Sequence, residues 1–271
     1  MNEGVKGSIS NFFGWFEYKW QFLSSLPDLL VKANITDERA RHVVKDLRLL
    51  RALVDLEVLG RVANPCVHSS KERFVKVLMG YSGQAEWALV SVPEMWYQIR
   101  QRGRQTRGRL EDGLRKVGAR PEWQNPNQTL CNLVAPSHVA DMGAEAAAAS
   151  LDKPLDQTAQ ALRAAGVCID AEVEALMREF THAAILYRDY RCGLAHEGRR
   201  RSHGWDIEGS PRQCPYYFSV TDVDTSGMQE SDACLVIPDV FTLAALGKCI
   251  EGVRRLCEAH GFDPYERAAF E

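Results

Sequence analysis

Two side chains suited to proton transfer and anion binding stand five residues apart in the segment YRDYRCGLAHEGRR, residues 187–200. They are Arg191 and His196. A histidine titrates near neutral pH, so its imidazole can take up or release a proton. The planar guanidinium of an arginine stays charged and can donate paired hydrogen bonds to a phosphate or a carboxylate. The spacing therefore marks a candidate site that handles an anion.

Arg191 is predicted to lie on the apolar side of one long helix over residues 171–195. At 100° per residue, the residues within about 40° of Arg191 are Val173, Phe180, Ala184 and Tyr187. A guanidinium cannot lose its proton, so an inward-facing position requires a partner, an interface or a bound anion. The alternative is a structural arginine that reaches water or bonds the last carbonyls of the helix.

His196 would lie about 140° from Arg191 around a regular helix. A looser turn at Gly193 could bring the two side chains together within one chain. Alternatively, two such helices from two chains could face each other and pool their residues.

The segment Arg191-Cys-Gly-Leu-Ala-His196 resembles the Arg-x4-6-His motif of the HEPN superfamily, whose common local form is Arg-Asn-x-x-Ala-His-Gly. The matching positions are Arg191, Ala195 and His196. Two positions depart from that form, because Cys192 replaces the usual polar residue and Glu197 stands where glycine is common.

The resemblance covers about residues 150–260. HEPN members are helical bundles, and many are metal-independent endoribonucleases of toxin–antitoxin, CRISPR and other antiviral systems. They usually act as dimers that bring both motifs to one interface. The resemblance thus implies a homodimer joined at residues 187–198, with RNA as substrate, no cofactor and no metal, and with a regulatory protein or defence complex as a further partner.

In such an enzyme the RNA supplies its own nucleophile, the 2′-hydroxyl. His196 would orient or deprotonate this hydroxyl, and Arg191 would stabilise the charge that builds on the phosphate. The expected products carry a 2′,3′-cyclic phosphate and a 5′-hydroxyl. The alternative, which Cys192 favours, is a catalytically inactive HEPN-like module for binding or dimerisation in a larger nucleic-acid-associated assembly.

Further arginines could extend a positive field along RNA. One group surrounds the motif and consists of Arg188, Arg199, Arg200 and Arg201. Another lies in the stretch 99–120, whose net charge of 8 − 2 = +6 contrasts with −3 − 6 = −9 for the rest of the chain. Its candidate RNA-binding residues are Arg102, Arg104, Arg107 and Arg109. The alternatives are solvated loops and ion pairs, such as Arg188 with Asp189 or the basic stretch with acidic helices.

The pattern of elements predicts a mainly α protein with a short β-hairpin before the C-terminal helix, and the resemblance implies that it is a HEPN-like helical bundle. In the first half, residues 14–33 are aromatic-rich, and Pro27 interrupts this run or starts a second helix. A helix is expected to follow Thr36 and end at Gly60. Its core-facing residues would be Val43, Leu47, Leu50, Val54 and Val58. Residues 71–81 predict a shorter helix, and 86–92 fit either a strand or a buried helical turn.

In the second half, a helix should follow Pro154 and stop at Gly166, and Asp170 should cap the next one. Residues 215–223 and 233–238 predict two strands joined by residues 227–232. The last helix spans residues 240–261, with core spacing at Leu243, Leu246, Ile250, Val253 and Leu256.

Composition sets the remaining expectations. A net charge of −3 excludes a polycation, and the chain contains no run of about 18 apolar residues and no signal-peptide pattern. We therefore expect a cytoplasmic protein with no membrane contact. The eight cysteines show no CxxC pair, which favours reduced and mostly buried thiols.

The domain organisation is expected to follow the shift in composition near residue 125. Residues 1–125 would form an N-terminal helical region that includes the basic stretch, and residues 126–271 would form the HEPN-like domain, with a single domain as the alternative. Motifs for phosphate loops, zinc proteases, serine hydrolases and dinucleotide folds are absent from the sequence.

Overall fold

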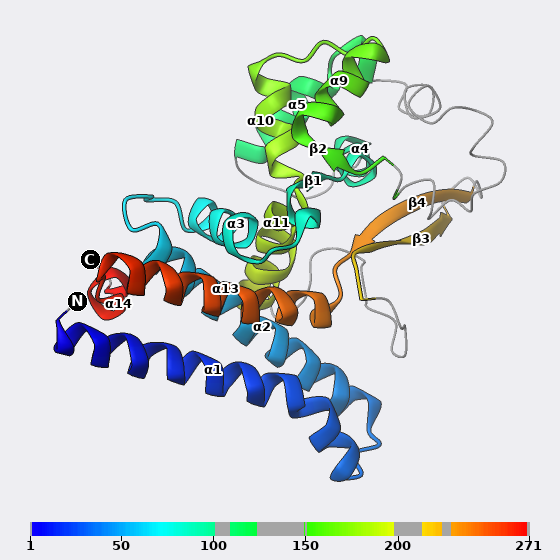
Figure 1. Cartoon of the computed structure of the whole chain (residues 1–271). Coiled ribbons are helices and arrows are strands. Elements are labelled where there is room, and N and C mark those ends of the chain that lie inside the picture. The colour runs from blue at the N-terminus through cyan, green and yellow to red at the C-terminus, as the bar shows by residue number, and fades with distance from the viewer. Residues whose placement is uncertain are drawn as a thin grey trace. The chain divides into compact units, whose positions relative to one another are not determined.

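The computed structural model describes residues 2–100, 109–123, 149, 151–197, 213–223 and 229–269. The protein is mainly helical, and the sheets among its described residues are two short antiparallel pairs, β1–β2 and β3–β4 (Figure 1). The β3–β4 hairpin directly precedes the long C-terminal helix. The predicted fold class, mainly α with a short hairpin before the last long helix, is confirmed. Within the described part of the chain, no helix is both long and apolar enough to cross a membrane.

The chain forms two compact units, each built from separate stretches of sequence. Unit 1 comprises Met1–Ala85, Leu186–Arg201 and Ile237–Glu271, and unit 2 comprises Glu86–Ile185 and Ser202–Val236. This division differs from the boundary expected near residue 125. The physical reason is that α5 (Arg109–Gly118) and α10 (Ala171–Glu179), which flank that position in the sequence, pack against each other inside unit 2.

Unit 1 is built on α1 (Glu3–Lys32), which begins at the N-cap Asn2 and continues through Pro27. The expected interruption at Pro27 is therefore not observed. One side of α1 buries Phe12, Phe13 and Phe16 in the core of the unit. The indole of Trp20 donates a hydrogen bond of 2.9 Å to the carbonyl of Leu243 on α13 (Asp239–His260).

The second helix of unit 1, α2, spans Glu38–Ala63 and is capped by Asp37 rather than Thr36. It does not end at Gly60. A Cβ at this position would lie 2.8 Å from the carbonyl oxygen of Arg73, so the glycine permits close approach of α3 (Ser70–Tyr81). Gly60 is thus a helix-packing residue and not a helix terminator.

The predicted core stripe of α2 is wrong in register. Val43 and Leu47 are 58% and 60% exposed, because the buried face carries other residues. The fully buried leucines of α2 are Leu49, Leu53, Leu56 and Leu59. This helix has apolar residues on more than one face, so spacing alone could not identify the buried one.

The C-terminal part of unit 1 agrees more closely with expectation. On α13, Leu243, Leu246, Ile250 and Val253 are buried, whereas Leu256 is half-buried. Gly261 ends this helix in the left-handed conformation at φ 65°. A short helix that was not expected, α14 (Pro264–Ala268), follows and lies beside the N-terminal half of α1, where Tyr265 contacts Phe12 (Figure 1).

Unit 2 begins with a 3₁₀ turn, η1 (Ala85–Ala88), and strand β1 (Leu89–Val90), so both alternatives for residues 86–92 are partly realised. β1 pairs with β2 (Lys153–Pro154). The helices α4 (Val92–Arg100), α5 and α9 (Leu155–Ala164) follow in sequence, with the turn η2 (Pro121–Trp123) after α5. After α9, Gly166 adopts φ 89°, as expected for a residue that ends a helix.

The hairpin of unit 2 consists of β3 (Tyr216–Val223) and β4 (Gln229–Val236). Tyr217 on β3 is paired in register with Leu235 on β4. The expected connection, residues 227–232, lies partly in β4, and residues 224–228 are outside the described part of the chain.

The single long helix expected over residues 171–195 is wrong, because four elements replace it. They are α10, α11 (His182–Ile185), the π-helix η3 (Leu186–Arg191) and α12 (Cys192–Glu197). The break falls at Thr181, which forms a β-bridge with Val90 and accepts a side-chain hydrogen bond from the amide of Ala184. Thr181 thus caps a new helix. The chain reaches the Arg191 motif through a π-turn, an element often found at functional sites.

Candidate active site

Arg191 is the last residue of η3, and its guanidinium forms an ion pair with Glu57 on α2 within unit 1. Both Nε and Nη2 of Arg191 lie 2.9 Å from the same oxygen, Oε2 of Glu57. The two side chains are 20% and 21% exposed. The inward-facing arginine therefore has a partner inside its own unit, which is one of the three alternatives that its position required.

The geometry of this pair leaves part of the guanidinium available. Glu57 occupies the edge formed by Nε and Nη2, so the two N–H groups of Nη1 and one of Nη2 are not used in that pair. Because the carboxylate holds one edge, the plane of the guanidinium is fixed. The remaining edge has the fork geometry that matches a phosphate.

Tyr187 lies next to this pair. The guanidinium carbon of Arg191 is 6.0 Å from the centre of the Tyr187 ring, and that ring also contacts Phe74 at 5.2 Å. Burial, followed by the negative charge of Glu57, raises the pKa of the Tyr187 phenol, while Arg191 and Arg73 oppose this rise. Tyr187 is thus a packed, protonated neighbour of the ion pair, in agreement with a packing role.

His196 lies in α12 and is exposed. The side chains of Arg191 and His196, both of which the structure describes, share no hydrogen bond. Gly193 is inside α12, whereas Arg191 is the last residue of the π-helix η3, so the 140° separation of a regular helix does not apply to this pair. Within one chain, Arg191 is paired with Glu57, and His196 is exposed.

Four other arginines near the motif were candidate RNA-binding residues, and the structure describes one of them. Arg188 forms a two-pronged ion pair with the neighbouring Asp189 at 2.6 and 2.7 Å, which is the structural alternative for this residue. Arg199, Arg200 and Arg201 lie outside the described residues.

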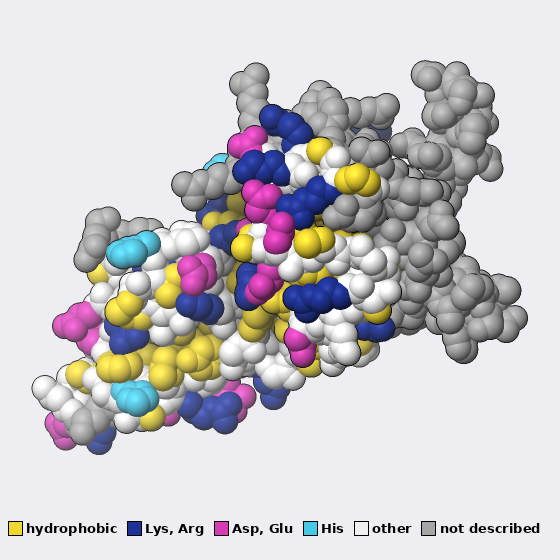
Figure 2. Space-filling model, turned by 90° about the horizontal axis from the view of Figure 1, so that it is seen from above, with side chains coloured by type: hydrophobic (Ala, Val, Ile, Leu, Met, Phe, Trp, Pro, Cys, Tyr) yellow, Lys and Arg dark blue, Asp and Glu magenta, His cyan; other side chains and the backbone are white. Residues whose placement is uncertain are grey.

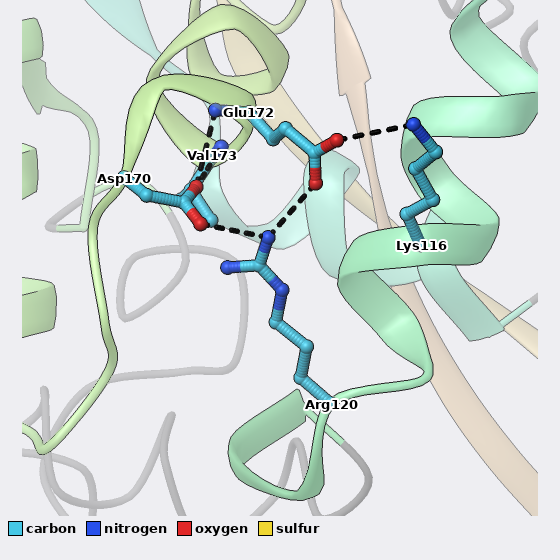
Figure 3. Close-up of polar contacts among 5 residues, drawn as sticks. All are labelled: Lys116, Arg120, Asp170, Glu172 and Val173. Carbon is cyan, nitrogen blue, oxygen red and sulfur yellow. Dashed lines mark hydrogen bonds and ion pairs between the residues drawn. The ribbon is translucent and has the colours of Figure 1, made fainter.

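The basic stretch 99–120 is described in part. Arg102, Arg104 and Arg107 fall outside the described residues, and Arg109 begins α5 without a described side chain. Figure 3 shows how the end of the stretch is engaged within unit 2. Lys116 contacts Glu172 at 3.1 Å, and Arg120 contacts Asp170 at 2.9 Å and Glu172 at 3.0 Å.

This cluster is built on the N-terminus of α10. Asp170 caps the helix by accepting hydrogen bonds from the amides of Glu172 and Val173 (Figure 3). The amide of Val173, and then the Arg120 guanidinium, lower the pKa of Asp170. The bonds to Asp170 and Glu172 raise the pKa of Arg120. At least these two basic residues therefore serve as partners of an acidic helix start.

The described surface shows the same mixture of charges. On the face seen in Figure 2, Lys and Arg side chains alternate with Asp and Glu, and they do not gather into a continuous patch of one sign. The face seen in Figure 2 therefore offers no continuous basic field for RNA.

A second polar cluster, inside unit 2, has almost entirely buried side chains. Tyr217 donates a hydrogen bond of 2.7 Å to Asp152 and lies 2.6 Å from the hydroxyl of Ser91. Nε2 of His182 is 2.9 Å from the other oxygen of Asp152. Burial and the nearby Asp152 charge raise the pKa of Tyr217 well above 10.0, so its phenol stays protonated. Because these side chains are buried, we assign the cluster to the core.

The cysteines differ from expectation in one respect. The six whose side chains the structure describes are free thiols, but Cys66, Cys168 and Cys214 are exposed, so the prediction of mostly buried cysteines is wrong. Burial raises the pKa of Cys249 to about 12, which makes that thiol unreactive. Among the described side chains, no group of three or more His, Cys, Asp or Glu residues could hold a metal ion.

Comparison of this chain with protein-family models, curated proteins and solved structures found no match. The assignment of this site therefore depends on its residues and their geometry.

One residue of the site was not anticipated. Glu57 lies on α2, 134 positions before Arg191, and no local spacing connects the two. The sequence did carry an indirect signal, because an inward-facing arginine requires an acidic partner or an anion.

Proposed function

We propose that the protein is a metal-independent, HEPN-like endoribonuclease whose catalytic residues are Arg191 and His196. The observation that carries the proposal is the guanidinium of Arg191, held on one edge by Glu57 and free to donate from the other. Such a fixed fork suits the negative charge that develops on a phosphate during cleavage.

The reaction follows from the two side chains. His196 takes the proton of the RNA 2′-hydroxyl, and the 2′-oxygen forms a bond to the adjacent phosphorus. The bond from phosphorus to the 5′-oxygen breaks, and that oxygen receives a proton from a histidinium or from water. Arg191 neutralises the phosphate oxygens during this exchange. The products carry a 2′,3′-cyclic phosphate and a 5′-hydroxyl.

Because the two side chains share no hydrogen bond within one chain, a second copy of the chain could supply His196 to the Arg191 of the first. A homodimer joined at residues 187–198 remains a prediction of the proposed function. RNA is the proposed substrate, the cytoplasm the proposed location, and bacterial defence or a toxin-type system the proposed setting.

A second candidate is a HEPN-like module without catalysis, serving in binding or dimerisation. The observation that favours this module is the ion pair itself, because the carboxylate of Glu57 already neutralises the charge of Arg191. A purely structural arginine would be paired in the same way.

Incubation of purified protein with total RNA, with and without EDTA, separates the two candidates. His196→Ala and Arg191→Ala should each reduce cleavage by about 10²–10⁴-fold while the fold is retained. His68→Ala is the matched control for the histidine, because His68 is also exposed in unit 1. Arg254→Ala is the control for the arginine, because Arg254 pairs with Glu17 across two helices of the same unit.

Cleavage that persists in EDTA and disappears only in the two site variants supports the enzyme. RNA cleavage by His196→Ala at the wild-type rate would show that the ribonuclease assignment to this site is wrong, and the binding module would then be preferred.

A further inference from the structure

The outer side of α1 carries an exposed apolar stripe that the rest of unit 1 does not cover. Trp15, Tyr18, Phe22 and Leu29 are 58%, 61%, 49% and 43% exposed. At 100° per residue they fall within about 60° of one another around the helix. Their spacing of three, four and seven residues is that of a helix seam that packs against another helix.

The stripe is separate from the face that α1 buries. Figure 1 shows α1 running beside α13. At 100° per residue, the core-facing Phe13 and Phe16 lie about 100° or more from every residue of the stripe, and Phe12 borders it at about 60° from Trp15. Trp15 and Tyr18 stack on each other, with ring centres 5.7 Å apart and planes at 14°. Two aromatic rings are therefore ordered against each other and still largely exposed.

The stripe also lacks charge. The charged residues of α1 are Glu3, Lys6, Glu17, Lys19, Asp28 and Lys32, three of each sign. Lys19, which lies beside the stripe, is bound to Asp55 at 2.6 Å, and Glu17 is bound to Arg254 at 2.6 Å. A face of this kind offers no complementarity to RNA phosphates or to an anionic lipid surface, both of which require clustered basic residues.

We propose that this stripe is the surface on which a second copy of the chain docks, with α1 of each copy packed against α1 of the other. An uncharged apolar patch is complementary to itself, and a two-fold axis brings the same patch of both copies together. The interface lies on α1 and does not rest on the proposed ribonuclease function.

The exposed area fits this occupant. A whole aromatic side chain buries about 150–250 Å², so at these exposed fractions the four side chains present roughly 400 Å² per copy. Two copies would bury about 800 Å² of apolar surface, whereas a standard interface of about 1,600 Å² contains about 900 Å² of it. The neighbouring uncharged residues Asn11, Gln21 and Ser25 would supply polar contact at the rim.

The test is sedimentation of the full-length protein at micromolar concentration. The wild type should have at least twice the mass of one chain, with a larger assembly where the 187–198 interface of the proposed function also forms, and Phe22→Lys or Tyr18→Glu should each raise the dissociation constant of the α1 interface about tenfold or more. Val31→Lys is the matched control, because Val31 is an apolar α1 residue that is 69% exposed and lies about 160° from Trp15. Circular dichroism establishes that each variant is folded, and the two stripe variants give independent readings.

Three outcomes overturn the proposal. They are a wild type with the mass of a single chain, an assembly whose mass neither stripe variant lowers, and equal dissociation by Val31→Lys. An assembly of unchanged mass would indicate another interface, such as residues 187–198. The wild type could instead be a single chain that pellets with anionic phospholipid vesicles, while Phe22→Lys does not pellet. The stripe would then bind a lipid surface and not a second copy.

Discussion

Arg191 shows how a side chain can be both structurally satisfied and chemically available. Glu57 offsets its charge within unit 1 with one carboxylate oxygen, and this leaves one edge of the guanidinium for a phosphate. In the proposed ribonuclease, Glu57 would be a positioning residue, because it would fix the plane of the group that meets the reacting phosphate.

Replacing Glu57 tests this role at the residue scale. Glu57→Ala leaves Arg191 unpaired and should lower the free energy of unfolding, and a double-mutant cycle with Arg191→Ala should give a coupling of about 0.5–2 kcal/mol. Glu57→Gln, which keeps the shape, should slow RNA cleavage about tenfold to a hundredfold per folded molecule. Urea unfolding and single-turnover cleavage provide the two measurements.

The Glu17–Arg254 pair is the control for this cycle, because it is more exposed, at 41% and 28%. Its coupling should be smaller, and its variants should cleave RNA normally. A coupling near zero for Glu57 and Arg191, with cleavage unchanged in Glu57→Gln, would contradict a positioning role.

Tyr217 provides a second test, inside unit 2. Tyr217→Phe removes the hydroxyl that contacts both Asp152 and Ser91 in a buried setting, and it should cost about 1–3 kcal/mol of stability. Tyr18→Phe, at an exposed position, should cost little. Equal stabilities of the two variants in urea unfolding would show that the buried network contributes nothing.

The same variant has a defined pH dependence. The pKa of Tyr217 is raised in the folded protein above its ordinary value of 10.0. Its contribution to the free energy of unfolding is therefore fully present below pH 10.0 and is lost as the pH rises above that value. The advantage of the wild type over Tyr217→Phe should therefore shrink above about pH 10. An advantage that grows above that pH would contradict the assignment.

At the scale of elements, helix α10 depends on its N-cap. Asp170→Ala should destabilise the protein by about 0.5–2 kcal/mol, and Asp170→Asn by less, because asparagine also caps helices. The lowered pKa of Asp170 means that the contribution of its charge is present above 3.8 and is lost as the pH falls through the folded-state pKa. Thermal unfolding at several pH values should show the wild type and Asp170→Asn converging in acid.

Asp156→Asn is the control, since Asp156 is an exposed acid in the first turn of α9, where no side chain caps the helix. A constant difference between wild type and Asp170→Asn down to the most acidic pH would contradict a role for the Asp170 charge.

The elements also show where sequence patterns succeed. Sequence signals predicted the structure correctly where neighbouring residues determine it, as for the N-cap at Asp170 and the left-handed Gly166. The predictions were wrong where a residue distant in sequence determines the structure. The sequence predicts that Gly60 ends a helix, but this glycine lies inside α2 and allows α3 to pack closely. The helix predicted over residues 171–195 is broken because Thr181 forms a β-bridge with Val90.

The candidate site has the same limit. Arg191 and its apolar neighbours could be found from helical periodicity, because Phe180 and Ala184 are buried even though the helix is broken. Glu57 could not be found, since its contact with Arg191 exists only after α2 and η3 pack together. The buried face of α2 could not be predicted either. The helix has apolar residues on several faces, and only the packing of a neighbouring element determines which face is buried.

At the scale of the whole molecule, charge is distributed unevenly along the sequence. The stretch 99–120 has a net charge of +6 against −9 for the remainder. Lys116 and Arg120 at its end are engaged by Glu172 and Asp170. If this stretch recruits RNA, the arginines at its beginning and middle must do so, because ion-paired residues release fewer counterions when they meet phosphate.

Replacing Arg102, Arg104, Arg107 and Arg109 with glutamine should accordingly weaken RNA binding. Each lost phosphate contact should reduce the slope of log K against log salt concentration by about 0.7 for single-stranded RNA. The control replaces Arg115, Lys116 and Arg120, which form ion pairs with Asp112, Glu172 and Asp170, and should leave the slope nearly unchanged. Equal losses in both variants would mean that only net charge matters. An unchanged slope in the first variant would mean that RNA binds elsewhere, because a contact that releases no counterions is not a phosphate contact.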